Sequence, residues 1–224
     1  MVCMTAVPDY LSQTYWWAYV HPNAVRLFER RWLVNLILFG NLGRLASAAL
    51  EALGGALPGR TLQVGCVYGD LTARLARRVC AGGRLDVADV LPVQLANLAR
   101  KLAPGAPVRL IHGDSTRLEL PSASYDRALL FFLLHEQPEQ VRRATLAEAL
   151  RVVKPGGTLA IVDYHRPSAW HPLYWPMVAV LRLLEPYALD LWRHEIETWL
   201  PRPIHGIEKA TAFGGLYQIL RITV

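Results

Sequence analysis

Thr61–Asp70 reads TLQVGCVYGD and places a short apolar run before two closely spaced glycines. Leu62 and Val64 alternate as in a buried strand, and a helix is expected directly after the stretch. Gly65 and Gly69 would let the backbone of such a turn pass close to a ligand, because neither carries a Cβ. The turn amides and the positive end of the following helix favour an anionic group. By itself, the stretch predicts either a ligand-binding turn or an ordinary strand-to-helix turn.

Strands and helices are expected to alternate after this stretch. The pattern predicts strands over 61–64, 84–90, 108–112, 126–134 and 158–162, and helices over 71–79, 92–102 and 138–153, the last ending at the glycine-rich stretch 154–157. Such alternation is typical of an α/β fold with a parallel sheet and right-handed crossovers. The tail predicts two further strands, joined through Gly214 and Gly215, at the far edge of the sheet.

Polar residues and a glycine follow several of the predicted strands. Ligands of open parallel sheets bind at the carboxyl ends of the strands. That rule places seven residues along one rim: Gly65, Asp89, Asp114, His135, Glu136, Asp163 and His165.

Two segments lie outside the alternation. The pattern over residues 1–57 predicts helices, including one over 25–41. We expect this segment to be either a cap that covers a sheet edge or a lid over an apolar substrate. Residues 166–203, rich in Pro and Trp, predict a helical insertion beside the rim of the domain 58–224. The tryptophans of both segments serve either as core or as a route for an apolar substrate.

Composition narrows the classes of partner. Hydrophobic residues make up 53% of the 224-residue chain, the mean hydropathy is +0.20 and the net charge is +6. A basic, aromatic-rich chain suits nucleic acid or an anionic membrane surface, and without a zinc-finger or RNA-binding signature we expect the membrane surface. Three cysteines without metal spacing read as reduced thiols, and neither a signal peptide nor a spanning run is evident. We therefore expect a cytoplasmic protein, peripheral on the inner face of a membrane.

Four pieces of the sequence together resemble a known family. In order, LQVGCVYGD, DVADV, HGDSTRLELPSASYDRALL and EALRVVKPGGTLAIVD resemble the Rossmann-like S-adenosylmethionine (SAM) methyltransferases, in the branch of the ubiquinone/menaquinone methyltransferases. The resemblance implies a class I fold with a mostly parallel seven-stranded sheet. It implies that Asp89 binds the ribose hydroxyls and that Asp114 lies beside the adenine. The other residues expected to contact SAM are Gln63, Gly65, Cys66, Val67, Tyr68, Gly69, Val90 and Ser115.

The turn departs from that family at two positions. The family usually has an acidic residue where this chain has Gln63, and a glycine where it has Val67. The segments YWWAY, CVYGD, HEQP and VDYH resemble a narrower group, the rhodoquinone biosynthesis proteins. That resemblance implies a different reaction, in which SAM donates its amino group to ubiquinone with the help of a divalent metal, manganese.

Amine transfer needs a neutral nitrogen nucleophile, and a carboxylate beside the SAM amine would favour the charged ammonium. We therefore hypothesise that Gln63 belongs to the switch from methyl to amino donation. A quinone carbonyl could be hydrogen-bonded by Tyr68 or Tyr164 during the addition. The sequence does not reveal which base drives cleavage of the carbon–nitrogen bond to the SAM residue. His194 and Glu195 are further candidates for the site, or simply surface residues.

Four residues are candidate metal ligands or, alternatively, polar strand ends without a metal. In strand geometry His135 and Glu136 would point to opposite faces, whereas Asp163 and His165 would share one. Imidazole and carboxylate ligands with open positions suit a catalytic manganese or iron site. Two rival functions stay open: methylation of a quinone or phenol, and a non-catalytic SAM-fold protein acting as a binding subunit.

Overall fold

Seven strands form a single sheet in the computed structural model, which describes residues 7–16, 21–204 and 206–224. The strands are β1 (Arg60–Val64), β2 (Arg84–Asp89), β3 (Val108–His112), β4 (Tyr125–Phe131), β5 (Val153–Tyr164), β6 (Ile207–Ala212) and β7 (Tyr217–Thr223). Their order is β3-β2-β1-β4-β5-β7-β6. Neighbours from β3 to β5 pair in parallel, whereas β7 runs antiparallel to both β5 and β6. The mostly parallel seven-stranded sheet and its terminal hairpin are thus confirmed.

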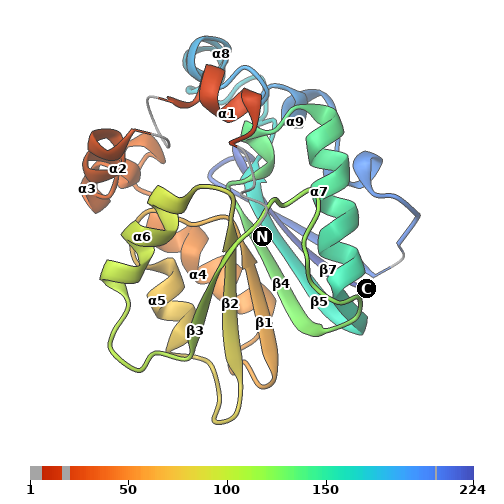
Figure 1. Ribbon diagram of the computed structural model, residues 1–224. Coiled ribbons are helices and arrows are strands. Elements are labelled where there is room, and N and C mark those ends of the chain that lie inside the picture. The colour runs from red at the N-terminus through yellow and green to blue at the C-terminus, as the bar shows by residue number, and fades with distance from the viewer. Residues whose placement is uncertain (1–6, 17–20, 205) are drawn as a thin grey trace.

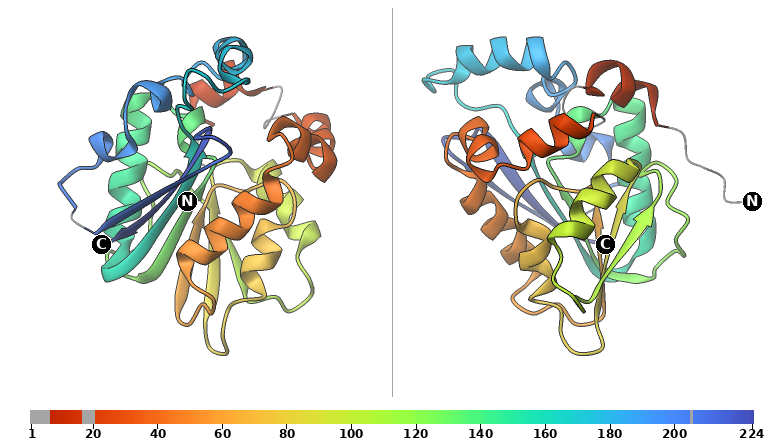
Figure 2. Two further views of the ribbon diagram at one scale, coloured as in Figure 1. Left: turned by 180° about the vertical axis from the view of Figure 1, so that it is seen from behind. Right: turned by 60° about the vertical axis from the view of Figure 1, so that its left-hand side comes forward.

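Helices cover both faces of the sheet. On one face lie α4 (Leu42–Leu53), α5 (Leu71–Ala76) and α6 (Pro92–Lys101), and on the other lies α7 (Glu139–Val152), as Figures 1 and 2 show. The inner strands are buried from both sides, so Leu62 in β1 and Leu129 in β4 are fully buried. This double coverage explains why the inner strands read as continuous apolar runs.

The segment 1–57 does not behave as one unit. Its last helix, α4, buries Leu45, Ala49 and Leu50 against the sheet and belongs to the core. The earlier helices, α1 (Asp9–Thr14), α2 (Pro22–Phe28) and α3 (Arg31–Ile37), lie toward the end of the molecule where β1, β2 and β4 finish (Figure 1). The insertion is present there as well, as α8 (Tyr174–Leu184), α9 (Asp190–Arg193) and the 3-10 turn η3 (Ile196–Trp199).

Three predicted boundaries are wrong. The helix predicted over 25–41 is broken between α2 and α3, where Arg30 is extended with ψ 103°. β4 ends at Phe131, and Leu134–Glu136 form a 3-10 turn, η2. The stretch 154–157 belongs to β5, because Val153 already pairs with Tyr125 of β4.

Long apolar helices are scarce in the described ranges. There, no single helix is long and apolar enough to cross a membrane. The pair α3 and α4 has the length and composition together, but the two helices meet at a bend of 88°.

Candidate functional site

A pocket opens where the chain order reverses. The chain runs from β1 outward to β2 and β3, then returns to β4 on the other side of β1. Ligands of such sheets bind at this switch point. The pocket walls come from the ends of β1, β2 and β4, and α1 closes it with Tyr10 and Leu11. The full lining consists of Tyr10, Leu11, Val64, Gly65, Cys66, Ala88, Asp89, Val90, Leu91, Gln94, Gly113, Ser115, Phe131, Phe132, Leu133 and Glu136.

The start of the glycine turn, Gly65 and Cys66, lines this pocket beside Asp89. Gly65 and Gly69 have φ angles of 85° and 86°, which side chains with a Cβ rarely adopt, so both positions require glycine. The carboxylate of Asp89 accepts the amide of Cys66 at 2.6 Å and that of Leu91 at 2.7 Å. Burial raises the pKa of Asp89, although both amides oppose the shift. The Cys66 thiol also bonds this carboxylate, so three of its about four acceptor positions are taken and one is left for a ribose hydroxyl.

Gln63 lies beneath the turn and not in the pocket. Its side chain is fully buried, and its amide donates to the Gly65 carbonyl at 2.9 Å. The Gln63 oxygen accepts the hydroxyl of Thr72, on α5, also at 2.9 Å. Both ends of the side chain therefore brace the strand-turn-helix unit. This buried position differs from the sequence-based interpretation, in which Gln63 faces the SAM amine.

A carboxylate from α2 secures the other end of the turn. Glu29 accepts the amide of Gly69 at 3.1 Å and the side chains of Asn97 at 2.6 Å and Lys101 at 2.9 Å. Lys101 also donates to the carbonyls of Val67 and Gly69. This network draws Glu29 toward α6, at the point where the predicted long helix breaks. In the sequence, the only signal for this network is one acidic residue, Glu29, among arginines.

The two residues predicted to lie near the adenine side of SAM, Asp114 and Ser115, line two different pockets. Ser115 lines the main pocket, where its hydroxyl bonds that of Thr145 at 2.8 Å. Asp114 instead lines the neighbouring pocket, and its carboxylate accepts the amide and hydroxyl of Thr116, both at 2.8 Å. Tyr10 borders both pockets, so Asp114 lies beside the main pocket and not within it.

His135 occupies a buried acidic cluster next to the main pocket. Its Nδ1 is 3.0 Å from Asp163 Oδ1, and its Nε2 is 3.8 Å from Glu136 Oε1. Asp163 shapes the η2 turn, since its Oδ2 accepts the amides of Leu134 and His135. His135 and Glu136 thus approach each other, contrary to the expectation from strand geometry. Because Glu136 lines the pocket, it connects the pocket to His135.

A third acid, missed by the sequence reasoning, faces this cluster. Glu185 follows directly after α8, and burial raises its pKa although His135 and Tyr15 lower it. Burial alone lowers the pKa of His135, but Asp163, Glu185 and Glu136 outweigh it and raise the pKa to about 9. The imidazole is therefore held as a cation near neutral pH, able to donate a proton or a hydrogen bond. Only burial among core residues distinguishes Glu185 from other acids, and the sequence does not display that.

Aromatic rings surround the cluster. The ring of Tyr164 lies 5.0 Å from that of His135, and Phe132 contacts both rings edge-on. Burial raises the pKa of Tyr164 well above its ordinary value, so its hydroxyl stays protonated. Tyr68 is differently placed, because its hydroxyl accepts the side-chain amide of Gln94 at 2.8 Å. Of the two tyrosines predicted to touch a quinone carbonyl, Tyr164 is the one beside His135.

Comparisons with known proteins agree with this arrangement. Residues 61–157 match the family described as "Methyltransferase domain". Over 146 residues the chain is 33% identical to an uncharacterized methyltransferase of Mycobacterium tuberculosis, covering 63% of this chain and 69% of that protein. The chain belongs to the SAM-dependent methyltransferase family. The solved SAM-dependent methyltransferase of Aquifex aeolicus shares the fold, with a TM-score of 0.57 and 18% identity over 91% of this chain and 99% of that one.

Another relative of this methyltransferase-family chain is named for quinones. The ubiquinone/menaquinone biosynthesis C-methyltransferase of Azotobacter vinelandii is 31% identical over 140 residues, 61% of this chain. The chain spans about half of that relative, 54% of its length. Because the family binds SAM and ligands of such sheets bind at the switch point, we expect SAM in this pocket.

Several residues predicted to contact SAM line this pocket, namely Gly65, Cys66, Asp89, Val90 and Ser115. Gln63, Val67, Tyr68, Gly69 and Asp114 do not line it. Tyr10, Leu11 and Gln94 were missed, because α1 and α6 reach the pocket only through the fold.

Three of the four residues predicted as metal ligands, His135, Glu136 and Asp163, lie together in this methyltransferase fold, but His165 does not join them. Both oxygens of Asp163 accept backbone amides, including that of Tyr164 at 2.8 Å. His165 turns away, with its Nδ1 2.7 Å from the Gly215 carbonyl and its Nε2 3.9 Å from Glu195. Within the described ranges, no group of three or more His, Cys, Asp or Glu residues is arranged to hold a metal ion. Glu195 also pairs with Lys209, and His194 is exposed beside Trp199.

Proposed function

We propose that this protein transfers the amino group of SAM to ubiquinone, replacing a ring methoxy group and producing rhodoquinone. The observation that carries the proposal is the position of His135, held by Asp163 beside the pocket-lining Glu136. Addition of an amine to a quinone places negative charge on a carbonyl oxygen. A protonated imidazole is suited to stabilise that charge, and the neighbouring hydroxyl of Tyr164 can supply a second hydrogen bond.

The chemistry of the first step balances without an external oxidant. The neutral amine of SAM adds to the ring carbon that bears the methoxy group, forming a carbon–nitrogen bond. The carbon–oxygen bond then breaks, and methoxide leaves with the amine proton as methanol. Release of the amino group from the SAM skeleton requires a further step. Loss of the α-proton would move two electrons into the quinone ring, and water would then hydrolyse the resulting imine to a 2-oxo acid and an aminohydroquinone. Transfer of two electrons and two protons from this aminohydroquinone to a second ubiquinone, or to dissolved oxygen, gives the aminoquinone.

Two features outside the His135 cluster support a quinone acceptor. The quinone-named relative in Azotobacter vinelandii is 31% identical over 140 residues. The pocket wall includes Phe131, Phe132 and Leu133, which suit an apolar ring. Ubiquinone carries an isoprenoid tail that lies in a bilayer, so the enzyme would act as a peripheral protein on the inner face of the membrane. The manganese requirement implied by the resemblance stays a prediction, without assigned ligands.

Methylation of a quinone or phenol is the second candidate, favoured by the names of the relatives. The two reactions differ in their products. We would incubate the protein with a short-tailed ubiquinone, Mn²⁺ and SAM labelled with ¹⁵N in the amino group, with and without a chelator, and read products by mass spectrometry. A ¹⁵N-aminoquinone supports the proposal, and its loss on chelation supports the metal. S-adenosylhomocysteine with a methylated acceptor would establish the second candidate instead, and SAM binding without product would favour the non-catalytic alternative.

A matched pair of variants tests the role of His135. His135→Gln should lower kcat for aminoquinone formation by about 10²–10⁴-fold with little change in SAM affinity. His165→Gln is the control, because His165 is also a histidine after a strand but binds the Gly215 carbonyl. Equal losses in both variants would contradict the assignment of His135.

A further inference from the structure

Exposed hydrophobic side chains are concentrated in two segments of this protein. Across the described residues, every strongly exposed large hydrophobic side chain lies either in 16–39 or in 170–184. Single exposed apolar residues are common on protein surfaces, but their confinement to two segments is not. Both segments flank the pocket end of the sheet (Figures 1 and 2).

Helix α3 is apolar but has no fully buried residue. Its sequence RWLVNLI contains five apolar residues of seven, yet none of its residues is fully buried. Trp32 is 60% exposed and Leu36 is 65% exposed. The helix therefore presents to its surroundings the kind of face that α4 presents to the core.

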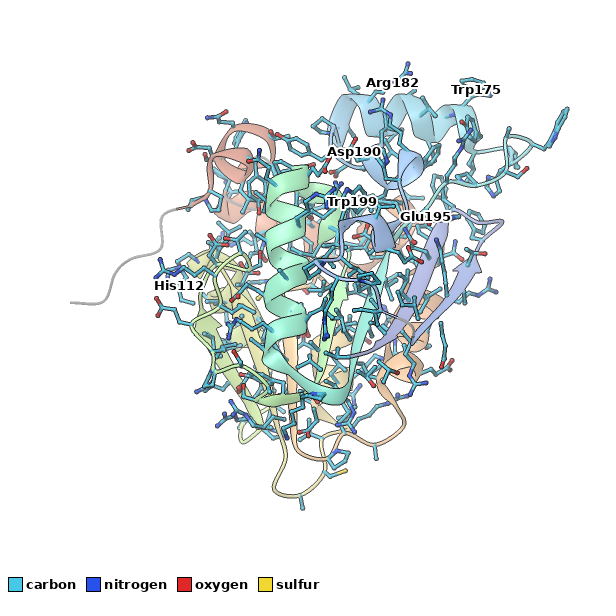
Figure 3. The ribbon with its side chains drawn as sticks, turned by 90° about the vertical axis from the view of Figure 1, so that its right-hand side faces the viewer. His112, Trp175, Arg182, Asp190, Glu195 and Trp199 are labelled. Carbon is cyan, nitrogen blue, oxygen red and sulfur yellow. The ribbon has the colours of Figure 1, made fainter. Side chains whose placement is uncertain are left out.

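Helix α8 is apolar on two sides. Met177 and Leu181 are buried against the core and fix the helix in place. On the outer side, Trp175 is 72% exposed and Leu183 is 81% exposed, and Trp170, just before the helix, is 95% exposed. Figure 3 shows Trp175 and Arg182 along α8 at this outer end of the molecule.

The two segments are physically linked. Phe39, just after α3, stacks on Phe213 with ring centroids 6.2 Å apart. Phe213 in turn contacts the ring of His171, before α8, at 5.5 Å. A chain of aromatic contacts thus joins the end of α3 to the start of the insertion, so both can face the same partner.

The charge of these segments is almost entirely positive. Together they contain four arginines and one acidic residue, Glu29, which Lys101 already neutralises. Arg26, Arg30 and Arg182 are exposed, and no acidic side chain pairs with them among the described residues. Arginines bordering exposed tryptophans complement an anionic lipid headgroup layer.

We propose that the outer faces of α3 and α8, with Trp170, form one docking surface for an anionic bilayer. The surface lies at the pocket end of the sheet, and Glu185, which interacts electrostatically with His135, follows directly after α8. A quinone could therefore pass from the bilayer to the site without its tail crossing water. The argument from quinone passage rests on the proposed function, whereas the argument from the exposed apolar surface is independent of it.

Vesicle co-sedimentation without quinone or SAM tests the surface separately from the reaction. The probes are phosphatidylcholine vesicles with and without phosphatidylglycerol. The full chain should sediment with the anionic vesicles, and added salt should weaken binding. The triple variant Trp170→Ser/Trp175→Ser/Leu183→Ser should bind about tenfold more weakly or worse. Unchanged SAM affinity of the triple variant, measured by calorimetry, would show that it is folded.

Charge variants provide the matched control. Arg182→Gln should weaken binding to anionic vesicles about fivefold. Arg77→Gln removes an equally exposed arginine at the end of α5, near the amino ends of the strands, and should have no effect. Absence of vesicle binding by the wild-type chain, or equal binding by the triple variant, would overturn the proposal. So would a wild-type dimer that the triple variant dissociates, since a second copy would then cover this surface.

Discussion

Replacing Gln63 by Glu tests whether this residue braces the turn or selects the group that SAM donates. In the structure, the Gln63 amide donates to the Gly65 carbonyl at 2.9 Å in a fully buried position. An introduced carboxylate cannot donate a hydrogen bond to the Gly65 carbonyl, and its oxygen would repel the carbonyl oxygen. Loss of the bond and the unsatisfied carbonyl together cost about 1–3 kcal/mol. Burial should raise the pKa of the introduced carboxyl, because an unpaired buried charge is costly.

The direction of the pH dependence follows from that raised pKa. Below about pH 4, the introduced carboxyl is protonated in both folded and unfolded chains, and its hydroxyl can replace the lost donor. As pH rises to the folded pKa, the unfolded chain loses its proton first, so Gln63→Glu loses stability relative to wild type. We expect a deficit of about 2–3 kcal/mol at pH 8 and a smaller one at pH 5, measured by urea unfolding.

Thr72→Val is the matched control for the Gln63 substitution. It removes the hydroxyl that donates to Gln63 but introduces no ionisable group. Its cost should be about 1 kcal/mol at both pH values. SAM affinity of Gln63→Glu should fall because the turn is distorted, while the identity of the transferred group stays the same. Wild-type stability at both pH values, or a switch from aminoquinone to methylated product, would refute the bracing role.

Three further predictions concern the supports of the pocket and sheet. Glu29→Gln should weaken SAM binding several-fold, because it loosens the turn. Glu51→Gln replaces an exposed acid on α4 and should leave SAM affinity, measured by calorimetry, unchanged. Equal SAM affinities of the two variants would contradict the tethering role of Glu29. Asp89→Ala should reduce SAM affinity at least about tenfold by calorimetry, because it removes the acceptor of two turn amides, and a wild-type dissociation constant would exclude Asp89 from the site. Burial raises the pKa of Asp86, but the hydrogen bonds from Tyr125 and Arg109 outweigh burial and lower the pKa. The stabilisation by Asp86 is therefore complete above about pH 4 and is lost as pH falls further. Asp86→Asn should lower the free energy of unfolding by about 2 kcal/mol at pH 7 and make stability less dependent on pH in acid, as followed by circular dichroism.

The functional picture depends on how the two outer segments meet the sheet. Tyr10 and Leu11 from α1 line the pocket at the switch point, and Glu185, directly after α8, interacts electrostatically with His135. These residues therefore adjoin the segments that expose tryptophan to the surroundings. This arrangement predicts that the attachment to a surface and the access of an acceptor are physically coupled.

The sequence by itself determined the sheet and the glycine turn. Strand and helix periodicity is local, so the alternation after Thr61 identified the five parallel strands, four of them to within three residues at each end, although β5 begins five residues before its predicted start. The requirement for glycine at positions 65 and 69 is also local, since it follows from the backbone angles of the turn. The same local rules place Asp89 at the end of β2, where a parallel sheet presents its ligands.

Only the tertiary structure decided which polar groups meet. Gln63 was predicted to face the cofactor, but a side chain on a strand can equally brace the turn, and the packing of α5 determined that it bonds Thr72. His135 and Glu136 were predicted to diverge, and the amides accepted by Asp163 instead fold them into one turn. Glu29 and Glu185 acquire their roles from partners distant in the chain. Hydrogen bonds and buried charges are set by three-dimensional neighbours, whereas periodicity is set by the residues next along the chain.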